Sequence, residues 1–210
     1  MKTVYLIRHG ESEANVGMIS EMEAPALTEK GQQQAAFLAE RASRLPVQAI
    51  VASTLLRAEQ TAEAVAKRTG LALETSPLFV ERSRASIQTD KPKDHEDFVI
   101  AEQNILANFT VPGYRFADEE NFDDLKERAQ KALQYLEERP EEHILVVTHG
   151  FFLRALIAQV TFGEALTAHE CDRMMWSFRT QNTGLTIIKY DETKDRPWWV
   201  YTWNDHAHLG

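Results

Sequence analysis

Two apolar segments of the sequence each end in a histidine followed by a glycine. They are residues 4–10 (VYLIRHG) and residues 144–150 (ILVVTHG). An apolar run without alternation is typical of a strand buried on both faces, as in the middle of a parallel sheet. Ligands of such sheets bind beyond the carboxyl ends of the strands. We therefore expect His9 and His149 to lie at a binding site.

Segments with strand and helix patterns alternate along the chain. Further strands are expected near residues 47–52 and 71–75, and helices over 29–44, 55–69, 98–108, 118–138 and 151–160. This alternation predicts an α/β fold, a three-layer α/β/α sandwich with a largely parallel central sheet. Three β-rich stretches are expected to add antiparallel C-terminal edge strands, namely 173–179, 185–190 and 198–203.

No repeat, low-complexity tract or linker divides the 210 residues, so we expect one domain over residues 1–210. Residues 82–97 show no clean period and are predicted to be a loop or lid, part of an insertion around 82–117. Arg82 and Arg84 lie in it. They either contact the distal part of a substrate or belong to a solvated loop.

The charge balance argues against a nucleic-acid partner or an anionic membrane surface. Lys+Arg number 23 and Asp+Glu 32, a formal charge of -9. A local arginine cluster would still allow an anionic substrate. A single cysteine, Cys171, suits a reducing compartment. We find no leader pattern and no apolar run near about 18 residues, so a cytoplasmic protein is expected.

Arg57 lies near the start of the helix expected after Ser53. A cation there opposes the helix macrodipole, at a cost of about 0.3–1 kcal/mol. An anion bound at this point would explain the placement, because it would receive both the dipole and the guanidinium. A solvated or salt-bridged arginine is the alternative.

Several blocks of the sequence, taken together, form a known signature. They are residues 8–12 (RHGES) with Asn15, residues 27–35, residues 53–62, Glu81, and residues 148–150 with Arg154 and Asn182. In this order they resemble the histidine phosphatase superfamily, in its phosphoglycerate-mutase-like branch. The blocks span most of the chain.

The resemblance implies a phosphoryl-transfer site. His9 would be the nucleophile, Arg8, Arg57 and protonated His149 would bind the phosphate oxygens, and Glu81 would be the general acid. A neutral imidazole can attack phosphorus to give a covalent intermediate. Fixed cations and donors can stabilise the equatorial oxygens without a metal. We therefore expect no metal and no cofactor.

The resemblance also implies substrate contacts, which we expect from Asn15, Ser12, Gly150 and Arg82. Phosphoglycerate mutases carry a longer segment after the acid, with an aromatic–Arg–Arg element that residues 82–112 lack. This departure favours a phosphatase that hydrolyses small phosphorylated metabolites. A mutase, which returns the phosphoryl group to substrate, is the nearest rival.

Two other functional classes and one oligomeric state are alternatives at the level of the sequence. A non-catalytic phospho-ligand binder would need neither a nucleophile nor an acid. A metallohydrolase using His9, His149 and the pair His206 and His208 would need clustered aspartates that the sequence does not show. The tryptophan-rich segment 198–203 is either core or an exposed edge strand, which leaves a homodimer open.

Overall fold

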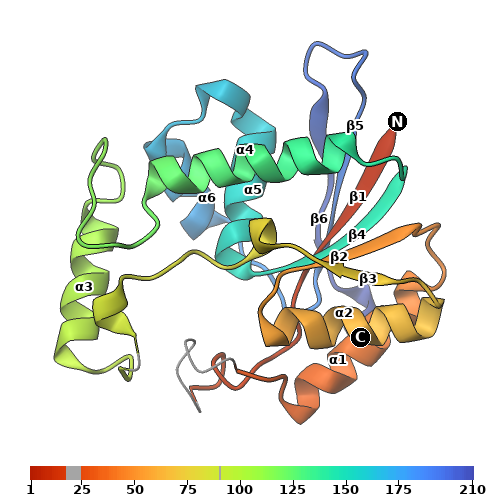
Figure 1. The fold of residues 1–210 in the computed structure, drawn as a ribbon, viewed down its shortest axis with the longest axis horizontal. Coiled ribbons are helices and arrows are strands. Elements are labelled where there is room, and N and C mark those ends of the chain that lie inside the picture. The colour runs from red at the N-terminus through yellow and green to blue at the C-terminus, as the bar shows by residue number, and fades with distance from the viewer. Residues whose placement is uncertain (18–24, 90) are drawn as a thin grey trace.

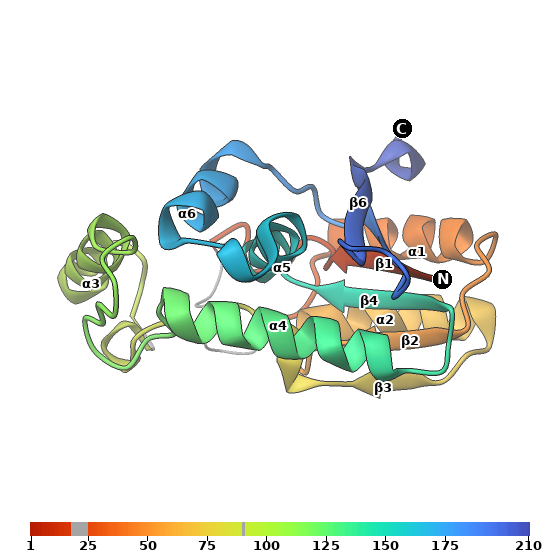
Figure 2. The ribbon, with the colours of Figure 1, turned by 90° about the horizontal axis from the view of Figure 1, so that it is seen from above.

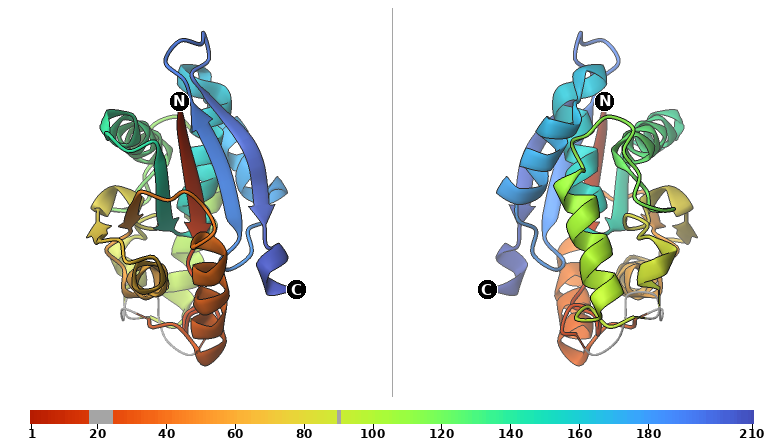
Figure 3. Two further views of the ribbon diagram at one scale, coloured as in Figure 1. Left: turned by 90° about the vertical axis from the view of Figure 1, so that its right-hand side faces the viewer. Right: turned by 90° about the vertical axis from the view of Figure 1, so that its left-hand side faces the viewer.

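The computed structural model describes residues 1–17, 25–89 and 91–210, and the strands of these residues form one sheet (Figure 1). Its order is β3-β2-β4-β1-β5-β6. The strands are β1 (Lys2–Arg8), β2 (Ala49–Ala52), β3 (Leu73–Thr75), β4 (His143–Thr148), β5 (Leu185–Tyr190) and β6 (Trp198–Asp205). The first four run parallel, and β5 and β6 add antiparallel strands at one edge, seen in Figure 3. The predicted α/β fold is confirmed.

Helices cover both faces of this sheet. The helices of the described residues are α1 (Glu29–Ala42), α2 (Leu56–Thr69), α3 (Glu96–Ala107), α4 (Phe122–Glu138), α5 (Gly150–Phe162) and α6 (Ala168–Ser177), with short 3-10 turns η1 (Pro77–Phe79), η2 (Ser86–Gln88), η3 (Gly163–Ala165) and η4 (Ala207–Leu209). The helices α1 and α2 pack on one face, and α4, α5 and α6 on the other (Figure 2). Across the described ranges, no helix combines the length and apolarity needed to cross a membrane.

The central strand β1 is buried on both faces, which explains its unbroken apolar run. Successive side chains of a strand point to opposite faces of the sheet. Val4 and Leu6 accordingly join the core under α4 and α5, whereas Tyr5 and Ile7 join the core under α1 and α2. At about 25 cal/mol per Å² of buried apolar surface, such two-sided burial is a main source of stability.

The prediction of a strand over residues 173–179 is wrong, because this stretch lies in α6 and the segment that follows it. Thr167 and Glu170 form a capping box, in which the Thr167 side chain accepts from the Glu170 N–H and the Glu170 carboxylate accepts from the Thr167 N–H. Met174 and Met175 then lie three and four residues after Cys171 and are buried. The cap and this helical spacing outweigh the β-propensity of the aromatic residues.

The segment 82–117, predicted as an insertion, is built around η2 and α3, and the described part stands beside the sandwich (Figures 1 and 2). It has a small core of its own, formed by Ala85, Ala101 and Ile105, with Phe116 packed against it. The ring of Phe109, just after α3, contacts the ring of Phe151 on α5, and thereby joins the segment to the sandwich.

Two glycines allow the chain after β1 to pass very close to α1. A Cβ atom at Gly10 would lie 2.7 Å from the backbone oxygen of Gly31, and a Cβ at Gly31 would overlap the backbone oxygen of Glu11. Backbone atoms cannot move aside as a flexible side chain does. Gly10 is therefore required by a close approach of two backbone segments, next to His9.

We expect Gly31→Ala to destabilise the protein by about 1–3 kcal/mol, as overpacked sites do. The sign is informative, because alanine is otherwise about 1 kcal/mol better than glycine inside a helix. Urea unfolding of the variant measures the change, with Gln33→Ala at an exposed position of the same helix as the control. A Gly31→Ala protein as stable as the parent would contradict the close approach.

Candidate active site

The register of β1 against β4 brings the two histidine–glycine ends together. Arg8 is paired with Thr148, and the ladder continues with the His9 N–H donating to the Thr148 carbonyl at 2.9 Å. The next residue on each strand is therefore a histidine. The ring centroids of His9 and His149 lie 5.0 Å apart at the carboxyl edge of the sheet.

A cleft of about 370 Å³ opens at this edge. The predicted site residues that line it are Arg8, His9, Asn15, Arg57, Glu81, Arg82 and Gly150. Arg84 and Glu102 from the segment 82–117 line it as well, and so does Trp176 from α6. The cleft thus lies between the sheet edge, the segment 82–117 and α6.

His9 is fixed in one tautomer by its hydrogen bonds. Its Nδ1 lies 2.7 Å from the Gly10 carbonyl oxygen, and Arg57 Nε donates to its Nε2 at 3.3 Å. We assign the proton to Nδ1 because a carbonyl can only accept, which leaves the lone pair on Nε2. Burial, and then the charges of His149, Arg57 and Arg8, hold the pKa of His9 well below its usual range. Nε2 is therefore unprotonated at neutral pH, as a nucleophile would have to be.

His149 is fully buried, and its Nε2 lies 2.7 Å from the Ser53 hydroxyl. That hydroxyl accepts from the Leu55 N–H and still has its own proton to donate, and we assign that proton to the contact with Nε2, which places the proton of His149 on Nδ1. Nδ1 has no hydrogen-bond partner among the described residues.

The surroundings of His149 oppose the protonated form that was expected for this residue. Burial lowers the pKa of His149 well below its usual value, and the nearby Arg57, Arg128 and Arg8 charges lower it further. Both histidines are thus neutral here. A neutral His149 with its proton on Nδ1 is still a hydrogen-bond donor.

Arg57 is the second residue of α2 and is 4% exposed, so the solvated alternative is wrong. Leu55 caps the helix without a side-chain hydrogen bond. The N-terminus of α2 and the buried Arg57 guanidinium therefore both lie beside His9. Arg8 is oriented by donating from Nη1 to the Thr180 carbonyl at 2.7 Å. These cations and the helix end favour an anion in the cleft.

Glu81 is bound to the N-terminus of α5. Its carboxylate accepts from the N–H groups of Phe151 at 3.2 Å and Phe152 at 3.0 Å, and from the N–H of Arg82 at 3.0 Å. The helix has no side-chain cap of its own at His149. Glu81 therefore serves as that cap from a distant part of the chain, which orients it at the cleft.

Arg82 is a buried residue of the cleft wall, with its side chain 6% exposed. Its guanidinium lies over the Phe151 ring, 4.7 Å from the centroid. Its ion-pair partner is Glu102, whose Oε2 lies 3.9 Å from the Arg82 Nη2. The Arg82 Nη1 has no hydrogen-bond partner in the described part of the chain. Burial lowers the pKa of Arg82. It is not part of a solvated loop.

Ser12 does not line the cleft, contrary to the expectation of a substrate contact. It is fully buried, and its N–H donates to the Asn15 side-chain oxygen at 3.1 Å. Asn182 donates to that oxygen at 3.2 Å and to the His9 carbonyl at 2.9 Å. The loop after β1 turns Ser12 inward, so this residue supports Asn15 from beneath.

Some residues of the site were missed at the sequence level. Thr61 accepts from the Gly10 N–H at 3.0 Å, and Arg128 and Glu120 bond to the chain around Glu81. Thr61 lay inside a recognised sequence block, whereas Arg128 is one polar residue among several on an amphipathic helix. Only its contacts distinguish it.

The described residues contain no group of three or more histidine, cysteine, aspartate or glutamate side chains that could hold a metal ion. The cleft instead gathers arginines and His9 near the Glu81 carboxylate, and the buried His149 ring, which does not line the cleft, lies behind His9. Such a set can bind an anion, supply a nucleophile and transfer a proton.

Comparisons with known proteins agree with this chemistry. The model of the histidine phosphatase superfamily (branch 1) matches residues 4–206. The probable phosphoglycerate mutase GpmB of Enterobacter sp. (strain 638) is 33% identical over 220 residues, covering 100% of this chain and 95% of that protein.

Solved structures share the fold. Bacillus stearothermophilus YhfR has a TM-score of 0.82 and 28% identity, covering 100% of both chains. A putative alpha-ribazole-5'-P phosphatase from Escherichia coli has a TM-score of 0.78 and 24% identity, covering 99% of this chain and 98% of that one. With the family match over nearly the whole chain, these findings show that this protein belongs to the histidine phosphatase superfamily, branch 1.

Proposed function

We propose that this protein is a metal-independent phosphatase that hydrolyses small phosphate monoesters through a phosphohistidine on His9. The observation that carries the proposal is the His9 ring, held with its Nε2 lone pair beside Arg57 in a cleft that also holds Glu81. A reaction needs this nucleophile and this acid together, whereas binding alone does not.

In the first step, Nε2 of His9 attacks phosphorus in line with the ester oxygen. The P–N bond forms, the P–O bond breaks, and Glu81 gives its proton to the leaving oxygen. Arg8 and Arg57 stabilise the charge on the equatorial oxygens. The N–H at Nδ1 of His149, for which the described residues offer no partner, can donate to the same group.

In the second step, water attacks the phosphohistidine. The Glu81 carboxylate takes a proton from the water, the P–N bond breaks, and inorganic phosphate leaves. The histidine and the protonated Glu81 are restored, so no net proton is consumed by the enzyme. The cleft is bordered by exposed Asn15 and Trp176, which supports access of water.

A phosphoglycerate mutase is the second candidate, because relatives of this chain are named probable phosphoglycerate mutases. A mutase must keep the phosphoenzyme dry until the second substrate oxygen is in place. The segment 82–117 borders the cleft, where a lid would lie. A mutase would need this segment to close over the phosphoenzyme. It lacks the mutase-type element, which favours water as the acceptor.

Arg82 is proposed to bind an anionic group in the distal part of the substrate. Its buried guanidinium has no hydrogen-bonded carboxylate among the described residues, and an isolated buried charge is costly. Arg84, on the same segment, adds a second cation to that wall. A small phosphorylated metabolite, with no nucleic acid or membrane, is the proposed partner. Buried Cys171 suits the proposed cytoplasmic location.

We expect His9 to carry the phosphoryl group during turnover. Rapid quenching after mixing with p-nitrophenyl phosphate, followed by mass spectrometry under alkaline conditions, should find phosphate on His9 with EDTA present throughout. His9→Ala should abolish turnover and keep the fold, as judged by circular dichroism. Phosphate on another residue would refute the mechanism, and loss of activity in EDTA that a divalent ion restores would revive the metallohydrolase.

We expect hydrolysis to dominate over isomerisation, because the cleft admits water and lacks the mutase element. The enzyme is incubated with 3-phosphoglycerate and 2,3-bisphosphoglycerate, and 2-phosphoglycerate and free phosphate are followed together. Phosphate should appear much faster. The opposite order would establish the mutase.

Arg82→Gln should weaken the use of substrates with a second anionic group. A hydrogen bond to a charged group contributes about 1.5–3 kcal/mol, so kcat/KM for 3-phosphoglycerate should fall by about tenfold or more. Glycerol 3-phosphate, which has a hydroxymethyl group in place of the carboxylate, should change little. Arg173→Gln, an exposed residue of α6 outside the cleft lining, is the control for charge. Equal losses on both esters would exclude the proposed contact.

A further inference from the structure

Glu81 lies in a stretch without regular secondary structure, between η1 and η2. Its carboxylate is bound to the N-terminus of α5, but these bonds do not by themselves fix the path of the chain on either side. A proton donor must be held in place relative to the leaving oxygen. The contacts that fix this stretch therefore bear on the reaction.

Arg128 of α4 holds the chain before Glu81. Its Nη1 donates to two backbone carbonyls, that of Leu78 at 3.0 Å and that of Val80 at 2.8 Å. Val80 directly precedes Glu81. A planar guanidinium with two bonds from one nitrogen leaves these carbonyls little freedom.

Glu120 holds the chain after Glu81. Its carboxylate accepts from the Ser83 N–H at 3.2 Å, and its own N–H donates to the Ser83 carbonyl at 3.0 Å. The same carboxylate binds Arg128 through two bonds, 2.6 Å from Nε and 2.7 Å from Nη2. The ion pair thus spans the segment and fixes it on both sides of the acid.

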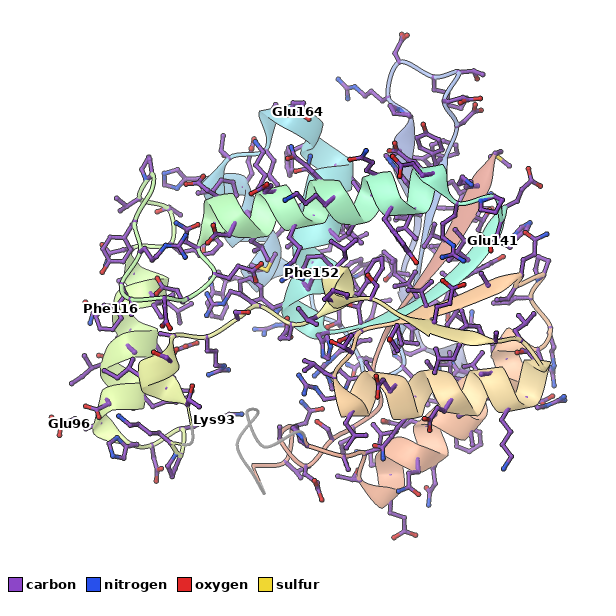
Figure 4. The ribbon with its side chains drawn as sticks, in the orientation of Figure 1. Lys93, Glu96, Phe116, Glu141, Phe152 and Glu164 are labelled. Carbon is purple, nitrogen blue, oxygen red and sulfur yellow. The ribbon has the colours of Figure 1, made fainter. Side chains whose placement is uncertain are left out.

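The pair is largely shielded from solvent. The side chains of Arg128 and Glu120 are 14% and 11% exposed. The guanidinium lies over the Phe152 ring, 3.9 Å from its centroid, and the Phe152 N–H is one of the donors to Glu81 (Figure 4 labels Phe152). Desolvation offsets much of the attraction in such a pair, so stability alone is a weak reason for it.

We propose that the Arg128–Glu120 pair positions Glu81 to protonate the leaving oxygen. This inference rests on the proposed function, in which Glu81 is the general acid. Neither residue lines the cleft, so both are positioning residues that act through Glu81. The pair should matter only when the leaving oxygen needs a proton.

The test compares two leaving groups by kcat/KM, which reports the steps up to transfer to His9. The leaving group of glycerol 3-phosphate is a strongly basic alkoxide, which needs a proton from the acid. The leaving group of p-nitrophenyl phosphate is a weakly basic phenolate, which does not. Arg128→Gln should lower kcat/KM for glycerol 3-phosphate by about 100-fold, the lower end of what general acid catalysis contributes. The value for p-nitrophenyl phosphate should change little.

A double-mutant cycle separates positioning from folding. Glu81→Gln should show the same dependence on leaving group, and adding Arg128→Gln to it should cause little further loss. Losses that multiply, or an equal loss on both esters, would overturn the proposal. Glu120→Gln, which keeps the shape of the side chain, should behave as Arg128→Gln does, and it replaces Arg128→Gln if that variant does not fold.

Arg139→Gln is the matched control. Arg139 follows the last residue of the same helix and binds Glu74 and Glu141 through paired bonds, away from the cleft. The Arg139→Gln variant should keep the parent kcat/KM for both esters. If Glu81→Gln itself shows no dependence on the leaving group, or if no phosphohistidine forms, the proposed function fails. If Glu81→Gln shows the dependence on leaving group but Arg128→Gln leaves kcat/KM unchanged for both esters, only the positioning role is refuted.

Discussion

The parallel pairing of β1 with β4 is the constraint on which the site depends. With Arg8 opposite Thr148, the next residue on each strand is a histidine, and the ladder holds the backbone of His9 in place. A shift of one residue would turn every side chain of β1 to the other face of the sheet. The apolar residues of both faces therefore enforce the register, and the core determines how close the histidines lie.

The core also sets the charge state of the site. Burial keeps His9 and His149 neutral, and the arginines around them lower the pKa of both further. A bound phosphate would reverse that electrostatic effect, because its negative charge stabilises nearby cations. A buried Arg57 in the first turn of α2 opposes the helix macrodipole, and an anion bound at this edge would offset that effect.

The acid is held by different means from the nucleophile. His9 follows a central strand, whereas Glu81 lies on an irregular segment and reaches the N-terminus of α5. Such a segment is not fixed by a sheet ladder, and the Arg128 side chain of α4 bonds to its backbone instead. The segment 82–117 begins at the residue after Glu81. A change in substrate contacts there can therefore alter the wall of the cleft without altering the strands.

The sequence by itself determined the buried strands β1 and β4, the main helices of the sandwich and the presence of Arg8, His9, Arg57 and Glu81 at the cleft, because local patterns and ordered blocks encode them. It misassigned α6, where a capping box outweighed β-propensity, and it did not reveal the inward position of Ser12. Only the tertiary structure decided the neutral state of His149 and the role of Arg128. Both depend on burial and on bonds between residues far apart in the chain, and no local period records these.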